Sequence, residues 1–119
     1  MSKQRGSQAE QTVAEQLRRA GHRIIDTNVH SRFGEIDILS EQHGTLVVTE
    51  VKARSNTRYG SPAEFVTPQK QQKIIRCLKH FLNGHPVWHT VPIRFDVACV
   101  TLRGDNMYID IIEAAFEAH

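Results

Sequence analysis

Residues 45–53 form an apolar stretch that nevertheless ends in charge. Its first half reads Leu-Val-Val at positions 46–48 and leaves no polar position to face water, which is typical of a strand inside a covered sheet. The stretch then carries Glu50 and Lys52, and these residue types are rarely fully buried unless they are paired. The fold must therefore offset their desolvation, and a metal ion together with a charged substrate is one candidate for doing so.

The 119 residues are 39% hydrophobic and 24% charged, which predicts a soluble globular protein. We predict one domain over residues 1–119, with residues 1–6 flexible. The formal charge of only +2 does not by itself indicate a nucleic-acid partner, but basic residues gather near the acidic motif and along one later segment. They are either solvated surface charges or contacts to a polyanion: Arg32, Lys52, Arg54, Arg58, Lys70, Lys73, Arg76 and Lys79.

Cysteine usage and hydropathy indicate the compartment. Cys77 and Cys99 are isolated and form no CxxC motif, so reduced core thiols are expected. The sequence has no apolar signal run and no apolar stretch long enough to cross a membrane. We therefore expect a cytoplasmic protein without a membrane partner.

Hydrophobic periodicity predicts two helices and five strands. The expected elements are a helix over residues 7–20, strands over 22–28, 35–40 and 45–53, a helix over 68–83, and strands over 92–101 and 107–112. Thr67 is the expected N-cap and Pro68 the first residue of the second helix. Residues 54–62 are predicted to form an exposed, mobile basic loop. The order α-β-β-β-α-β-β indicates an α/β sandwich, in which helices flank a mixed central β-sheet.

Two carboxylates and a lysine are expected at one end of this sheet. Glu50 and Lys52 are two residues apart in a strand and so leave the same face, while Asp37 lies in the neighbouring strand. Two carboxylates a few Å apart repel by about 1–4 kcal/mol, and Mg²⁺ would relieve that repulsion. The backbone carbonyl of Val51 is a further possible ligand. The alternative is a Glu50–Lys52 pair on an edge strand, worth about 0–1 kcal/mol.

A third carboxylate, Glu10, precedes Val13, Ala14 and Leu17 by three, four and seven residues, so it lies on the core-facing stripe of its helix. It is either a first-turn acid favoured by the helix dipole or a carboxylate aimed at a site.

Three further polar residues each have two interpretations. Glu35 shares the strand face of Asp37 and either supports the site or pairs with Arg54. Asp96 stands inside an apolar strand, and we expect a buried pair with an arginine, either Arg94 of a neighbouring chain or Arg54. Lys70 either contacts a phosphate or covers apolar surface with its stem.

Motifs along nearly the whole chain resemble those of the YraN-type family of bacterial proteins. They are Gly6-x-x-Ala9-Glu10, Asn28, Gly34-Glu35-Ile36-Asp37-Ile38-Leu39, Glu50-Val51-Lys52-Ala53-Arg54, Gly60-x-Pro62, Lys70 and Arg94-Phe95-Asp96-Val97. Through that family the chain resembles the PD-(D/E)xK nuclease superfamily, nearest to the archaeal Holliday-junction resolvases. Two departures stand out: Ile36 replaces the proline that usually leads the motif, and Thr49 replaces an aromatic or aliphatic residue.

The resemblance implies a restriction-endonuclease-like core and DNA cleavage that depends on Mg²⁺ or Mn²⁺. It implies catalytic roles for Glu10, Asp37, Glu50 and Lys52, with the metal held by Asp37, Glu50 and the Val51 carbonyl. By position near these motifs, Arg32, Arg54, Arg58 and Lys70 are predicted to bind nucleic acid. A homodimer is expected by analogy.

Three functions remain open from the sequence. The first is an endonuclease that hydrolyses structured or branched DNA. The second is a nucleic-acid-binding module without catalysis, and the third is a scaffold protein whose acidic cluster is only a network of ion pairs.

Overall fold

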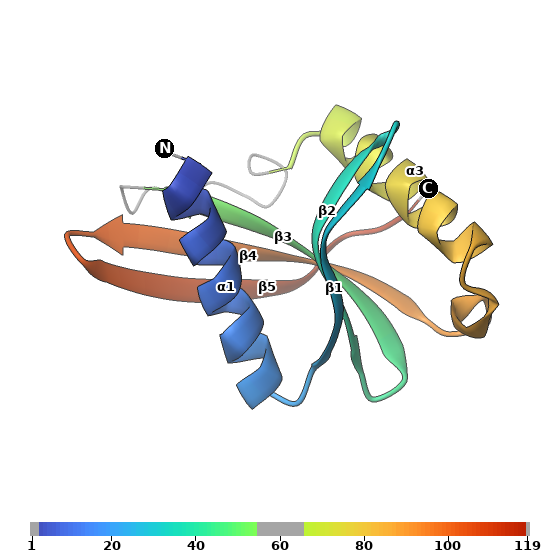
Figure 1. The fold of residues 1–119 in the computed structure, drawn as a ribbon, viewed down its shortest axis with the longest axis horizontal. Helices are drawn as coiled ribbons and strands as arrows, with labels where there is room; N and C mark the ends of the chain where they lie inside the picture. The colour runs from blue at the N-terminus through green and yellow to red at the C-terminus, as the bar shows by residue number, and fades with distance from the viewer. Residues whose placement is uncertain (1–2, 55–65, 119) are drawn as a thin grey trace.

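The chain folds around one mixed sheet whose spatial strand order follows the sequence (Figure 1). The computed structural model describes residues 3–54 and 66–118, with residues 3–7 described by their backbone only. Its elements are α1 (Lys3–Arg19), β1 (Arg23–Ser31), β2 (Gly34–Gln42), β3 (Thr45–Arg54), α3 (Pro68–Asn83), the short 3-10 helix η1 (Pro86–Trp88), β4 (Ile93–Arg103) and β5 (Asn106–Phe116). The predicted order α-β-β-β-α-β-β is confirmed, and the arrangement is consistent with a restriction-endonuclease-like sandwich.

The sheet combines hairpins with one crossover. β1, β2 and β3 pair antiparallel in succession, and β4 and β5 form a second antiparallel pair. The predicted turn at His43 and Gly44 joins β2 to β3, and both residues have the positive φ that tight hairpin turns favour. β3 and β4 are parallel, so the chain between them must cross over, and it does so through α3.

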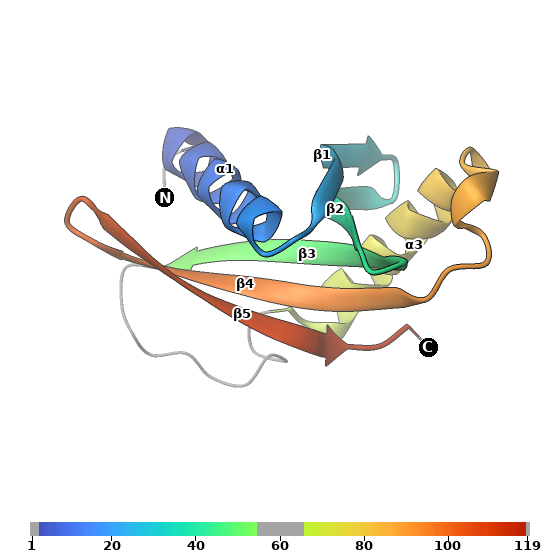
Figure 2. The ribbon, with the colours of Figure 1, turned by 90° about the horizontal axis from the view of Figure 1, so that it is seen from below.

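The two long helices cover opposite faces of the sheet. Val13 and Leu17 of α1 share one apolar cluster with Ala98 and Val100 of β4. α3 contributes to a second cluster on the other face: Ile74, Ile75, Cys77, Leu78 and Phe81 pack there with Val48, Phe95, Val97 and Cys99. Figure 2 shows α1 lying across one face of β3, β4 and β5. Both faces of the central strands are therefore covered, which explains their nearly continuous apolar sequence.

α3 has the boundaries expected from its capping residues. The Thr67 hydroxyl accepts a hydrogen bond from the Lys70 N–H at 3.2 Å, and Pro68 is the first helical residue. α1 begins at Lys3, earlier than the predicted residue 7. Ser7 and Glu10 have the spacing of an N-terminal capping box, but lysine, glutamine and arginine at positions 3–5 are good helix formers, and the helix extends back through them.

Asp96 stabilises the C-terminal part of β5. It is 1% exposed, and its carboxylate accepts hydrogen bonds from Nε and Nη2 of Arg94, both at 2.9 Å. The predicted buried pair is confirmed, but the partner is Arg94 of the same chain, because residues two apart in a strand share a face. The carboxylate also accepts the N–H of Ala114 at 3.0 Å, where φ is +51°. This contact lies in a bulge that carries β5 on to Phe116, beyond the predicted residue 112.

Among residues 3–54 and 66–118, no helix combines the length and apolar character needed to span a bilayer.

Candidate active site

The site lies where β2 separates from β3. The two strands pair from Gln42 opposite Thr45 to Ile38 opposite Thr49, and the pairing stops there. At the next position along β2, Oδ2 of Asp37 accepts the backbone N–H of Val51 at 2.8 Å. The carboxylate thus supplies the acceptor that a paired strand would have offered. The two ribbons diverge at this point, and the β1–β2 hairpin turns toward α3 (Figure 1).

A cleft of about 190 Å³ opens at this fork. Four elements supply its walls, namely α1, β2, β3 and α3. It is lined by Ala9, Glu10, Glu35, Asp37, Glu50, Val51, Lys52, Ala53 and Lys70. The structure therefore brings together all four residues that the resemblance assigns to catalysis, although Glu10 and Lys52 are 42 positions apart in the sequence.

Glu50 is the most constrained charge in the cleft. Its side chain is only 6% exposed, and its Oε1 lies 3.0 Å from Nζ of Lys70. Its Oε2 is buried and has no hydrogen-bond partner among the described residues. Burial and the neighbouring Asp37 charge raise the pKa of Glu50 to about 7, against the opposing effect of Lys70. The carboxylate is thus only partly compensated by the protein itself.

Asp37 and the Val51 carbonyl complete a possible ligand set for a metal. Burial raises the pKa of Asp37, while the hydrogen bond from the Val51 N–H lowers it. The N–H and C=O of one residue point to the same edge of a strand, so the Val51 carbonyl also faces the fork. Within the described part of the chain, no three His, Cys, Asp or Glu side chains are grouped to hold a metal by themselves. The ligand set that the site offers is two carboxylates and one carbonyl.

Lys52 and Lys70 lie close enough to influence each other. Burial lowers the pKa of Lys52, and a hydrogen bond with Lys70 and the Lys70 charge lower it further. Burial opposes protonation of Lys70 as well, but the hydrogen bond with Lys52 and the Glu50 charge raise its pKa overall. Lys70 is therefore the cation held by Glu50, and Lys52 is the amine that loses its proton more easily.

Glu10 faces the cleft, as its place on the inner stripe of α1 predicted. Burial raises the pKa of Glu10, the Asp37 charge raises it further, and a hydrogen bond with the Asn28 side chain lowers it. Sequence reasoning did not assign Asn28 to the site. Its φ of +53° within β1 is unusual for a residue other than glycine, and its side chain hydrogen-bonds with Glu10. The only signal in the sequence was its presence among the family-like motifs.

Glu35 lines the cleft beside Asp37, and its Oε2 lies 3.2 Å from Nδ1 of His30. Sequence reasoning did not consider His30 as a partner. The pair joins β1 to β2 near their connecting turn, where His30 and Glu35 are register partners.

The residues predicted to bind nucleic acid are distributed around the site. Lys70 lies in the cleft on Glu50, whereas Arg54 ends β3 two residues after Lys52. Arg32 is in the β1–β2 turn, with its guanidinium carbon 4.8 Å from the centre of the Phe33 ring, and it does not line the cleft. Arg58 and most of the predicted basic loop lie outside the described residues.

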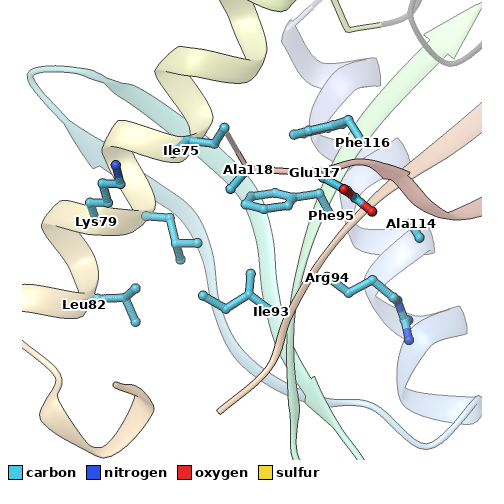
Figure 3. A pocket seen from close by; sticks show the side chains of 11 residues that line it. Ile75, Lys79, Leu82, Ile93, Arg94, Phe95, Ala114, Phe116, Glu117 and Ala118 are labelled. Carbon is cyan, nitrogen blue, oxygen red and sulfur yellow. The ribbon is translucent and has the colours of Figure 1, made fainter. Parts of the chain in front are cut away.

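A larger cavity of about 460 Å³ lies between α3, the start of β4 and the end of β5. Figure 3 shows Phe95 and Phe116 within it, with Lys79 on α3 and Arg94 and Glu117 on the opposite side. Its walls are mainly apolar, and Arg94 is already bound to Asp96. It lacks a pair of carboxylates, so the smaller cleft is the better candidate for phosphate chemistry.

Comparison with known proteins agrees with the family predicted from the motifs. The model of "Uncharacterised protein family UPF0102" matches residues 9–100, a segment that contains Glu10, Asp37, Glu50, Lys52 and Lys70. The chain belongs to this family. UPF0102 is the YraN family, so the resemblance stated from the sequence is confirmed at the family level.

Similar UPF0102 proteins come from several bacteria. The chain is 38% identical to one from Persephonella marina over 104 residues, which cover 87% of each chain. It is 38% identical to one from Syntrophus aciditrophicus over 112 residues, or 94% of this chain and 87% of the relative. It is 34% identical to one from Legionella pneumophila strain Philadelphia 1 over 118 residues, which cover 99% of this chain and 98% of the relative. The UPF0102 similarity thus extends over almost the whole chain.

Proposed function

We propose that the protein binds DNA and hydrolyses its phosphodiester bonds with the help of a divalent metal, and that structured or branched DNA is the substrate. Glu50 carries the proposal. One of its buried oxygens is paired with Lys70, and the other has no hydrogen-bond partner among the described residues. An unpaired buried carboxylate oxygen is costly, and a cation between Asp37 and Glu50 would remove that cost.

The donor set fits Mg²⁺ or Mn²⁺. Mg²⁺ binds oxygen ligands and typically takes one or two carboxylates, with waters and substrate phosphates filling the other positions. Asp37, Glu50 and the Val51 carbonyl would hold the ion. When bound, it would polarise the phosphodiester and make water a better nucleophile.

The lysines of the cleft would complete the chemistry. Lys52, whose pKa is lowered, would take the proton of the attacking water, or in its charged form would stabilise the negative charge that develops on the phosphate. Lys70 would be released from Glu50 once a metal neutralises that carboxylate, and could then contact a phosphate oxygen. Glu10, oriented by Asn28, would hold a water on the Asp37 side of the cleft.

A cleavage assay tests the proposal. Labelled junction, flap, single-stranded and duplex DNA are incubated with the protein in Mg²⁺, Mn²⁺ or EDTA. We expect cleavage that needs metal and is lost in Asp37→Ala and Lys52→Ala, whereas Glu15→Ala, which removes an exposed carboxylate of α1, retains it. Cleavage that continues unchanged in Asp37→Ala would exclude this site.

One observation favours a second function, a nucleic-acid-binding module without catalysis. Nζ of Lys70 lies 3.0 Å from Oε1 of Glu50, so a side chain of the cleft offsets part of the charge for which a metal is proposed. This function predicts DNA binding that weakens as salt rises, with no strand cut under any metal. It also predicts that Mg²⁺ leaves the melting temperature unchanged, whereas the metal-dependent site predicts a rise.

A further inference from the structure

α3 carries charge of one sign on one side. Residues 68–83 include four lysines or arginines and no acidic residue. Its buried side is apolar, while Lys73, Arg76 and His80 are exposed. Their spacings of three and four residues place these three side chains on one face of the helix. Lys79 belongs to a different side, because it lines the apolar cavity (Figure 3).

The turn between β1 and β2 packs against this face of α3. A Cβ added at Gly34 would lie 3.1 Å from Cβ of Lys73, so the two backbones approach closely. The ring of Phe33 meets that of His80 edge to face, with centroids 6.2 Å apart. The guanidinium carbon of Arg32 lies 4.8 Å from the centre of the Phe33 ring, and Arg32 is itself exposed. The turn thus adds a fourth basic side chain. We call Arg32, Lys73, Arg76 and His80 the basic face.

The basic face begins one helical turn from the cleft. Lys70 lies one helical turn before Lys73 and reaches Glu50 in the cleft. From Lys70 to His80 the helix rises about 15 Å, a length that spans about four phosphates of one DNA strand at 3.4 Å of helix axis each. The acid nearest to this path on the hairpin, Glu35, is paired with His30. A row of basic side chains of this length matches a regularly spaced polyanion better than a compact anion.

We infer that the basic face binds the phosphate backbone of DNA on one side of the cleft and guides the strand from Asp37 and Glu50 toward the tip of the β1–β2 hairpin. The inference rests on the proposed function, since it takes DNA as the substrate. It adds a specific surface, which lies outside the cleft and on two elements that do not hold the metal. Charge complementarity and continuity with the cleft select DNA as the occupant.

Binding measurements test this surface. We compare the triple variant Arg32→Ala, Lys73→Ala, Arg76→Ala with a control triple, Arg19→Ala, Arg23→Ala, Arg103→Ala, which removes three exposed charges from α1, β1 and β4. Affinity for labelled duplex DNA is measured by anisotropy in EDTA across a salt titration. Each phosphate contact contributes about 0.9 to the slope of log affinity against log salt. In the basic-face triple, we expect the magnitude of this slope to fall by about 0.9 for each contact removed, and the affinity for DNA to fall about tenfold or more. The control triple should keep the wild-type slope.

Two further measurements keep the inference separate from folding and from catalysis. The single charge reversal Arg76→Glu changes one exposed residue and should weaken DNA binding by itself. Circular dichroism and melting temperature should match the wild type for this variant and for the basic-face triple. The basic-face variants should keep the melting response to Mg²⁺, because they leave Asp37 and Glu50 intact.

Several outcomes would overturn the inference. The first is a basic-face triple that binds DNA as tightly as the wild type. The second is an equal loss of affinity in both triples, and the third is a wild-type protein that does not bind DNA. RNA duplex bound more tightly than DNA, with the same salt slope, would reassign the occupant. DNA binding that depends on the basic face but yields no cut strand would refute catalysis and leave this surface standing.

Discussion

The buried carboxylate of Glu50 makes stability depend on pH in a predictable direction. Its pKa is about 7 in the folded protein against an ordinary value of 4.5. The unfolded chain therefore loses this proton first, so the associated stability is fully present below pH 4.5 and is lost as pH rises through 7. At 1.36 kcal/mol for each pH unit, this burial costs about 3 kcal/mol of folding free energy above pH 7.

Glu50→Gln removes that cost, because an amide has nearly the same shape and cannot ionise. We expect the variant to be more stable than the wild type by about 3 kcal/mol at pH 8, or roughly 10 °C in melting temperature for a chain of this size. At pH 4 the two proteins should be equally stable, since Glu50 is then protonated in both folded and unfolded states. Urea unfolding at a series of pH values measures the difference directly.

Metal supplies a second comparison. Saturating Mg²⁺ should stabilise the wild type at pH 8 and leave Glu50→Gln unaffected, which narrows the gap between them. Glu15→Gln is the matched control, because Glu15 is an exposed carboxylate of α1 whose ion pairs with Arg18 and Arg19 contribute only about 0–1 kcal/mol. A Glu50→Gln protein that gains nothing at pH 8, or gains as much at pH 4, would refute the reasoning.

Three other substitutions follow from single contacts. Lys70→Met leaves Glu50 without this cation, so we expect the free energy of unfolding to fall by about 1–3 kcal/mol at neutral pH. Mg²⁺ should then raise the melting temperature more than it does in the wild type, and an unchanged response to Mg²⁺ would contradict this. Thr49→Val should stabilise the protein by about 1 kcal/mol in urea unfolding, because the buried Thr49 hydroxyl has no hydrogen-bond partner among the described residues. A loss of stability would show that this hydroxyl makes a hydrogen bond. Asp96→Ala removes both short hydrogen bonds of Arg94, which keeps Glu113 at 3.7 Å, and it frees the Ala114 N–H. It should lower the free energy of unfolding by about 1–3 kcal/mol and increase amide exchange at Ala114, and protection that persists there would contradict the role of the contact.

Local signals of the sequence predicted the order of the elements and several of the charged residues that line the cleft. Thr67 and Pro68 define the start of α3 because capping and proline geometry act over only a few residues. The combination of an apolar strand with Glu50 and Lys52 indicated a charged site, since few other arrangements tolerate such residues at the end of a buried strand. The inward stripe of α1 placed Glu10 correctly for the same reason, as helical periodicity is local.

Tertiary structure alone decided how those charges are partnered. The separation of β2 from β3 gives the Val51 N–H to Asp37, and the crossover through α3 brings Lys70 to Glu50 from twenty positions away. The turn of the β1–β2 hairpin likewise packs against α3, with Gly34 close to Lys73 and Phe33 edge to face with His80. The sequence determined which residues needed compensation. The fold determined which partner provides it, because strand register and helix placement depend on packing across the whole sheet.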